Sequence, residues 1–241
     1  MQPPFCTLAH LLRRNYRRAD RIARKTAYIA YVNKISHMSH KDIGDYIDKA
    51  TGGLGYLGKP GQDDYRVITL GCYIAWAEKT AYADRILEIG TGLGRTNYCV
   101  RYMNKNAIIH SIEIDPIILG IALYQNPYEY FSESLRNNKT LIFLNDAFMI
   151  IEILHRNNEI YDHIIHDGGP NPGKNTRIYS YRFLNTLYKL LRKGGSISIF
   201  AGKNPYYVKR IYNDLKNIGF KKLETINPPG IPVRIIHGEK Q

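Results

Sequence analysis

The residues that could do chemistry in this sequence are acids, glycines and one histidine that stand at or just after short apolar runs. Such runs are typical of buried strands, and open α/β sheets bind their ligands at the carboxyl ends of the strands. The candidate binding residues are Glu88, Gly90, Gly92, Gly94, Glu113, Asp115, Asp146 and Ala147. The candidate catalytic residues are His166 and Asp167. The sequence therefore predicts a ligand site at the strand ends.

Three alternating glycines, Gly90, Gly92 and Gly94, follow the strand-like segment 86–89. Glycines allow a tight turn and let a ligand lie against bare backbone. A helix-compatible run begins near Arg95, and its first N–H groups can face polar ligand atoms. Glu88 stands two residues before the first glycine. A carboxylate there would repel a pyrophosphate, but it suits a ligand that carries an ammonium and a sulfonium group.

A second acid, Glu113, lies 23 residues after Gly90, at the end of the next apolar run. This is close to the roughly 20 residues that separate a glycine loop from an acid that binds ribose hydroxyls. A carboxylate suits this task because it can accept hydrogen bonds from both hydroxyls. Asp115 is the alternative, two residues later on the same face of the strand. We prefer Glu113 for the ribose.

His166 and Asp167 end the fourth predicted strand and are the best placed to orient an acceptor or take its proton. Histidine has an unperturbed pKa near 6.5, which suits proton transfer. The alternatives are a histidine bonded to backbone and an aspartate that forms the turn before Gly168. His163 points to the opposite face of the strand and is expected to be structural.

The elements that position these residues alternate between strands and helices. Predicted strands cover 86–89, 107–116, 140–144, 161–165 and 196–202, and a final hairpin covers 221–226 and 233–236. Predicted helices cover 67–83, 95–104, 117–124, 147–154, 179–191 and 207–218. This alternation predicts an α/β, Rossmann-like fold with a mostly parallel sheet and an antiparallel C-terminal hairpin.

Residues 1–50 differ in composition and predict a basic helical extension, followed by the main domain at 51–241. A helix from Thr7 to Lys25 carries Arg13, Arg14, Arg17, Arg18, Arg21 and Arg24. It either binds a phosphate backbone, such as RNA, or caps the core, with its arginines packed against Asp42, Asp45 and Asp48. Arg24 has the spacing for an ion pair with Asp20. The glycine-rich segment 52–61 predicts a loop, either a flap over the ligand or a linker.

The bulk composition limits the class of protein. The 241 residues suffice for one sizeable core, and the formal charge of +13 favours polyanionic partners. No apolar run approaches the roughly 18 residues of a membrane span, and the first residues do not read as a secretory signal. The 3 cysteines lack the spacing of a metal site. We therefore expect a cytoplasmic protein without a bound metal, with a small-molecule or protein acceptor still open beside RNA.

Taken together, these motifs resemble the class I S-adenosylmethionine-dependent methyltransferases. The segments 90–94, 113–116, 126–128, 145–147, 166–170 and 178–183, with the glycine pair at 194–195, are similar to a group of predicted archaeal methyltransferases that is spermidine-synthase-like. The resemblance implies a seven-stranded sheet and S-adenosyl-L-methionine as cofactor. It implies that Glu88 and the glycine loop hold the amino-acid end, that Asp146 accepts from the adenine amino group, and that Ala147 lies beside the ring. Asp146 is otherwise a helix N-cap, and both roles are compatible.

The sequence departs at one place from the pattern of this group and at another from that of the related aminopropyltransferases. The Asp-Pro-Pro of the group is Asp167-Gly168-Gly169 here. The loss of both prolines argues against a base nitrogen as the methyl acceptor. The related aminopropyltransferases carry a second aspartate three residues after the first, and this position is Pro170. Methyl transfer to an unknown acceptor, with RNA or another polyanion slightly favoured, is our prediction. Aminopropyl transfer of the spermidine-synthase type and a non-catalytic nucleotide- or RNA-binding protein are the alternatives.

Overall fold

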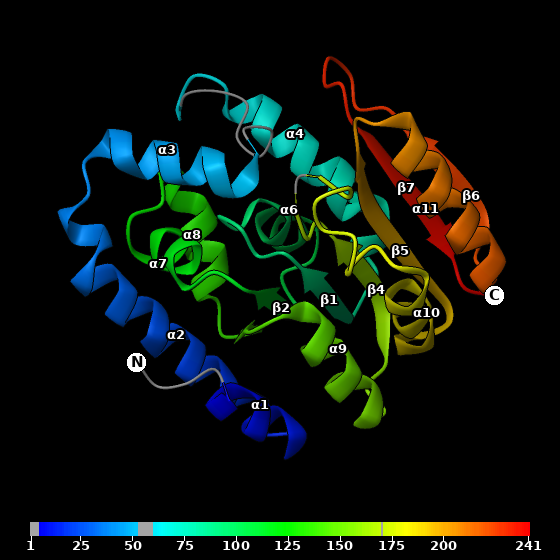
Figure 1. Cartoon of the computed structure of the whole chain (residues 1–241), viewed down its shortest axis with the longest axis horizontal. Helices are drawn as coiled ribbons and strands as arrows, with labels where there is room; N and C mark the ends of the chain where they lie inside the picture. The colour runs from blue at the N-terminus through cyan, green and yellow to red at the C-terminus, as the bar shows by residue number, and fades with distance from the viewer. Residues whose placement is uncertain (1–4, 53–59, 170) are drawn as a thin grey trace.

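The computed structural model describes residues 5–52, 60–169 and 171–241, and its strands form one seven-stranded sheet in the order β3-β2-β1-β4-β5-β7-β6 (Figure 1). The strands are β1 (Arg85–Ile89), β2 (Ile108–Glu113), β3 (Thr140–Leu144), β4 (Tyr161–His166), β5 (Leu191–Gly202), β6 (Lys221–Ile226) and β7 (Arg234–Glu239). The pairs among β1 to β5 are parallel, whereas β7 runs antiparallel to β5 and to β6. The predicted fold class is confirmed.

Helices cover both faces of the sheet because the parallel strands are apolar on both sides. The helices are α1 (Phe5–Leu12), α2 (Tyr16–Asn33), the 3-10 turn η1 (Ile35–His37), α3 (His40–Thr51), α4 (Asp64–Ala75), α5 (Ala77–Thr80), α6 (Arg95–Met103), α7 (Pro116–Tyr124), α8 (Glu129–Arg136), α9 (Ala147–Arg156), α10 (Tyr181–Leu190) and α11 (Pro205–Ile218). One core lies under α9, α10 and α11, and two others lie under α4 and α6 to α8. The sheet is therefore doubly wound, with its switch point between β1 and β4.

Side-chain caps start the helices that follow the strand ends. Asp115 accepts from the N–H groups of the first turn of α7, and Asp146 accepts from Phe148 N at the start of α9. Asn204 caps α11 in the same way, and Pro205 occupies its first position. Two of the acids predicted to bind ligand thus also fix where the chain leaves the sheet.

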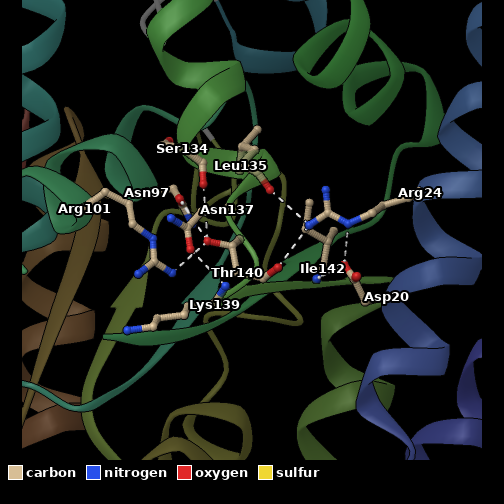
Figure 2. A network of polar contacts seen from close by, with 10 residues as sticks. All are labelled: Asp20, Arg24, Asn97, Arg101, Ser134, Leu135, Asn137, Lys139, Thr140 and Ile142. Carbon is tan, nitrogen blue, oxygen red and sulfur yellow. Dashed lines mark hydrogen bonds and ion pairs between the residues drawn. The ribbon is translucent and has the colours of Figure 1, made fainter. Parts of the chain in front are cut away.

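Helix α2 covers the edge of the sheet at β3, as Figure 2 shows. Asp20 Oδ1 accepts from Ile142 N at 2.9 Å, and Arg24 Nη2 donates to Thr140 O and Leu135 O, both at 3.0 Å. Asp20 and Arg24 also form an ion pair at 2.8 Å, at the predicted spacing. The two side chains satisfy backbone groups of an edge strand that would otherwise invite another strand to pair. The predicted domain boundary at residue 50 stays a prediction. The contact between α2 and β3 joins the two predicted parts of the chain.

Several elements differ from the predictions: β2 ends at Glu113, β7 continues to Glu239, and helix α8 was not predicted. The basic N-terminal helix is broken between α1 and α2, where Arg14 has a φ of +56° and Asn15 caps the second helix. The helix predicted at 67–83 is interrupted at Trp76, whose φ is +49° and whose ring stacks on His237 at 4.1 Å. Strand β5 begins five residues before the predicted Ser196, at Leu191.

The loop predicted at 52–61, as a flap or a linker, falls largely on residues 53–59, which lie outside the described residues. Across the described ranges, no helix combines the length and apolar character needed to cross a bilayer.

Candidate functional site

A cavity of about 510 Å³ opens at the carboxyl ends of β1, β2, β3 and β4, where the strand order reverses. Seven of the predicted site residues line it: Gly90, Gly92, Glu113, Asp115, Asp146, Ala147 and Asp167. Thr51 at the end of α3 and the loop 174–178 complete its walls. A volume of this size falls within the roughly 300–1,000 Å³ of small-molecule sites. The structure thus brings together residues from four strand ends.

The glycine loop is set by backbone geometry that other residues adopt rarely. Gly90, Gly92 and Gly94 have φ values of +91°, +51° and +92°. A Cβ on Gly90 would lie 2.4 Å from the carbonyl oxygen of Asp167, and one on Gly94 would lie 2.8 Å from Leu135 side-chain atoms. Gly94 therefore serves packing at the start of α6 and does not line the cavity, whereas Gly90 and Gly92 do.

Glu113 and Asp115 are both held by backbone N–H groups. Glu113 Oε1 accepts from Ile114 N and Asp115 N at 2.8 and 2.9 Å, and Oε2 accepts from Gly92 N at 2.9 Å. Burial raises the pKa of Glu113, and these backbone hydrogen bonds oppose the shift. A carboxylate offers about four acceptor positions. Glu113 uses three of them, so one position remains on Oε2.

Asp115 is divided between two structural partners. Its Oδ1 caps α7, and its Oδ2 accepts from Tyr46 Oη of α3 at 2.8 Å. This contact holds α3 against the cavity. Burial, and after it the hydrogen bond to Asp115, raises the pKa of Tyr46 to about 12. The pair explains why α3 contributes to the wall.

Asp146 and Ala147 line the side of the cavity next to β3. Asp146 Oδ1 caps α9 through Phe148 N at 2.8 Å, and Oδ2 pairs with Arg177 at 2.7 Å. The Arg177 side chain is 58% exposed and also stacks over the Phe148 ring. Exposed ion pairs contribute little, so an amino group of a ligand can replace Arg177 at Asp146.

Asp167 is paired inside the cavity. Arg95 Nη2 lies 3.0 Å from Asp167 Oδ2, and the two side chains are only 7% and 19% exposed. Burial raises the pKa of Asp167, and the Arg95 guanidinium holds that rise back. Asp167 Oδ1 makes no hydrogen bond within residues 5–52, 60–169 and 171–241, so a hydrogen-bond acceptor remains on a carboxylate at the end of β4.

Glu88 and His166 are fully buried and do not line the cavity. Glu88 accepts from Ser111 and Asn97 side chains and from Thr96, and burial raises its pKa to about 7. It thus fixes the start of α6 beneath the glycine loop.

His166 is bonded at both ring nitrogens. Nε2 donates to Ile178 O at 2.9 Å, Nδ1 faces Gly168 N at 3.4 Å, and burial lowers its pKa to about 4. Of the two candidate catalytic residues, only Asp167 reaches the cavity.

Three cations that line the cavity were not among the predicted site residues: Arg95, Lys174 and Arg177. The signal for Arg95 was its place directly after the glycine loop, at the first position of α6, where a side chain can turn back towards the strand ends. Lys174 and Arg177 stand in a loop without periodicity, so no pattern pointed to them. The cavity lining thus contains four acids and three cations.

The sheet order and the placement of this cavity define a Rossmann-like fold of the kind used by S-adenosylmethionine-dependent transferases. A model of the spermine/spermidine synthase domain matches residues 77–238. The chain belongs to this family. No curated protein matches the sequence.

Solved structures of two kinds of transferase share the fold. A spermidine synthase from Thermotoga maritima aligns with a TM-score of 0.60 and 17% identity over 72% of this chain and 60% of its own. A spermidine synthase in complex with the transition-state analogue AdoDATO gives 0.58 and 16%, over 72% and 59%. The O-methyltransferase TomG from Streptomyces achromogenes, in complex with SAM, gives 0.55 and 16%, over 71% and 80%. This chain spans about 60% of the length of the two spermidine synthases.

Proposed function

We propose that the protein is an S-adenosyl-L-methionine-dependent methyltransferase whose cofactor binds in the cavity at the strand ends. The residues present fit this cofactor: the loop 90–92 offers backbone, Glu113 Oε2 retains an acceptor position for a ribose hydroxyl, and Asp146 can accept from an amino group. A Cβ at Gly90 would disturb the junction between this loop and Asp167. The cofactor supplies the methyl group on an already activated sulfonium.

The observation that carries methyl over aminopropyl transfer is the ion pair between Arg95 and Asp167 in the cavity. Arg95 offsets the negative charge of Asp167 that would hold a cationic amine acceptor, and position 170 is proline where the aminopropyltransferase pattern has a second acid. The N-terminus of α6 beside the glycine loop also favours a cofactor that has kept its carboxylate. Decarboxylated S-adenosylmethionine lacks that group.

Within this proposal the protein's own residues align the reactants and hold one proton. The loop 174–178 and the end of α3 form walls of the cavity that position the bound reactants. Asp167 Oδ1 accepts the proton of the incoming nucleophile, while Arg95 keeps the carboxylate oriented through Oδ2. A raised pKa makes Asp167 a better base than an exposed aspartate.

The test is transfer of label from methyl-labelled S-adenosylmethionine to separated RNA, protein and small-molecule fractions. We expect label in one fraction, and Asp167→Asn to lower the rate about 100-fold, the lower range for loss of a general base. Glu224→Gln, an exposed acid on β6, is the matched control and should leave the rate unchanged. Transfer only from decarboxylated S-adenosylmethionine to a diamine would overturn the proposal.

Aminopropyl transfer remains the second candidate because the spermine/spermidine synthase domain match covers most of the main domain. Methyl transfer moves the methyl group of S-adenosylmethionine, whereas aminopropyl transfer moves the aminopropyl group of the decarboxylated form. Incubation with each cofactor, labelled in the group it would transfer, therefore distinguishes the two activities.

We also propose that the acceptor is RNA or another polyanion that contacts the exposed arginines of α1 and α2. Arg13, Arg17, Arg18 and Arg21 are exposed, and no guanidinium group of these four forms a hydrogen bond or ion pair within the described residues. Asp42 completes the capping box of α3 with the N-cap residue Ser39, and no ion pair joins Asp42, Asp45 or Asp48 to an arginine among those residues. The formal charge of +13 supports the same partner class.

A further inference from the structure

A second cavity of about 300 Å³ lies between α11 and the strands β6 and β7. It is separate from the cofactor cavity and shares no lining residue with it. In Figure 1, α11 lies in front of β6 and β7 at the side of the sheet farthest from α2. We call it the α11 groove; its lining is Lys203, Pro205, Val208, Lys209, Tyr212, Thr225 and Arg234.

Three cations from three different elements line the α11 groove. Lys203 follows β5, Lys209 belongs to α11, and Arg234 begins β7. The groove has no acidic lining residue, and none of the three forms an ion pair within the described part of the chain. Cations held together without a counterion repel each other, so an anion bound among them would lower the energy of the site.

The backbone brings these cations together. Gly202 pairs with Arg234 across the β5–β7 ladder after a register shift, and Gly202 has a φ of +75°. Such an irregularity turns the following residue away from the strand. Thr225 lies opposite Ile236 in the β6–β7 ladder, which places it on the same face as Arg234, two residues away. The groove is thus positioned by paired strands and by α11, not by a loose surface loop.

The polar groups of the groove match a phosphate group. Two lysines and an arginine supply positive charge and N–H donors, and the Thr225 hydroxyl adds a further donor. A phosphate monoester has a charge near −2 and three acceptor oxygens, so it can use all of them. We infer that the α11 groove binds the phosphate group of a phosphorylated ligand, through Lys203, Lys209 and Arg234.

The groove lies at the same edge of the sheet as the cofactor cavity. Lys203 follows Phe200, which lines that cavity, by three residues, a distance of at most about 11 Å along an extended chain. The inference does not require methyl transfer, because it rests on the groove alone. A phosphorylated ligand there can be a small molecule or a nucleic-acid strand, and these share the chemistry that the groove recognises.

The test measures binding of inorganic phosphate, ribose 5-phosphate and an oligouridylate to the full chain at constant ionic strength, with S-adenosylhomocysteine present to fill the cofactor cavity. The double variant Lys203→Gln/Lys209→Gln removes two cations of the groove. The matched control, Lys216→Gln/Lys221→Gln, removes two exposed lysines outside it. Circular dichroism checks that both variants fold.

We expect inorganic phosphate and ribose 5-phosphate to bind, and ribose, added as an uncharged control, not to bind. The groove variant should lose affinity about tenfold or more, and the control variant less than about twofold. Weakened binding of oligouridylate alone would support the groove with a polymer as the phosphate source. Failure of all three probes, or equal losses in the two variants, would overturn the inference. Affinity for S-adenosylhomocysteine is measured separately in the wild type and in each variant. Lack of S-adenosylhomocysteine binding would count against the proposed function, whereas lack of phosphate binding would count against the groove.

Discussion

The acids around the cofactor cavity bind the protein's own backbone as well as offering positions to a ligand. Asp115 and Asp146 cap helices, and Glu113 accepts from the glycine loop. Their identity and their places at strand ends could be predicted from the sequence, because apolar runs and glycines mark those ends. Arg95 could not be assigned in this way, since only the tertiary structure shows that its side chain meets Asp167.

At Gly92 we predict that a side chain abolishes cofactor binding and leaves the fold intact. Gly92 lines the cavity with a φ of +51°, so valine there both strains the backbone and enters the ligand space. Gly230→Val is the matched control, because Gly230 has a φ of +69° with nothing within 4 Å of an added Cβ. Calorimetry with S-adenosylhomocysteine should detect binding in the control and none in Gly92→Val. Near-wild-type affinity in Gly92→Val would show that the loop does not hold the cofactor.

For the ribose contact we predict that Glu113→Ala weakens S-adenosylmethionine binding by about 1–3 kcal/mol, the range for hydrogen bonds to a charged group. Asp115→Ala is the comparison, because its carboxylate is used by α7 and Tyr46. Equilibrium dialysis of the two variants decides between them. The assignment moves to Asp115 if only its replacement weakens binding.

Among the elements, the strands and most helices of the main domain were predicted, whereas helix α8 and the interruptions were not. Helix periodicity continues through Arg14 and Trp76, yet both residues have positive φ. Trp76 leaves the helix because its ring stacks on His237 of β7, a contact between residues far apart in the sequence. Helix α2 shows the same limit: its charge pattern did not reveal that Asp20 and Arg24 bind the edge of β3 (Figure 2).

For α1 and α2 we predict that the exposed arginines bind RNA and do not affect cofactor affinity. The variant is Arg13→Gln with Arg17→Gln, Arg18→Gln and Arg21→Gln. It keeps Arg14, which donates to Asn157 O, and Arg24, which holds β3. Because neutralised phosphates release counterions, RNA binding should weaken linearly in a log–log salt plot, and the variant should flatten the slope.

The control for this prediction replaces four other exposed lysines, Lys41, Lys49, Lys105 and Lys193, with glutamine. Its slope should stay close to that of the wild type, so that loss of charge alone is excluded. Equal slopes for the wild type and the arginine variant would make α1 and α2 a structural cover only.

At the scale of the whole molecule, four buried histidines make stability depend on pH. Burial lowers the pKa of His110, His166 and His237 to about 4 and that of His163 to about 3. Each therefore takes up a proton on unfolding at pH values between its folded pKa and about 6.5. Protonation of these histidines in the unfolded state therefore lowers the stability of the folded protein as the pH falls from about 6.5 towards 4. Glu88 acts in the opposite direction between about pH 4.5 and 7, because its folded pKa is raised.

We predict that the free energy of unfolding falls as the pH is lowered from 7 to 5, by up to about 1.4 kcal/mol per pH unit for each histidine that is protonated only in the unfolded state. Glu88, Glu113 and Asp167, whose pKa values burial raises, offset part of this fall. Urea denaturation at half-unit steps of pH measures it. Equal stability at pH 5 and pH 7 would contradict the burial of these side chains.

The central claim is that the cavity at the switch point holds S-adenosyl-L-methionine with its carboxylate intact. Its most direct test is calorimetric titration of the wild-type protein with S-adenosylmethionine and with decarboxylated S-adenosylmethionine, with Gly92→Val as the blank. We predict that S-adenosylmethionine binds about tenfold or more tightly than the decarboxylated form, because the N-terminus of α6 beside the glycine loop favours a carboxylate. Tighter binding of decarboxylated S-adenosylmethionine, or no heat with either compound, would contradict the account.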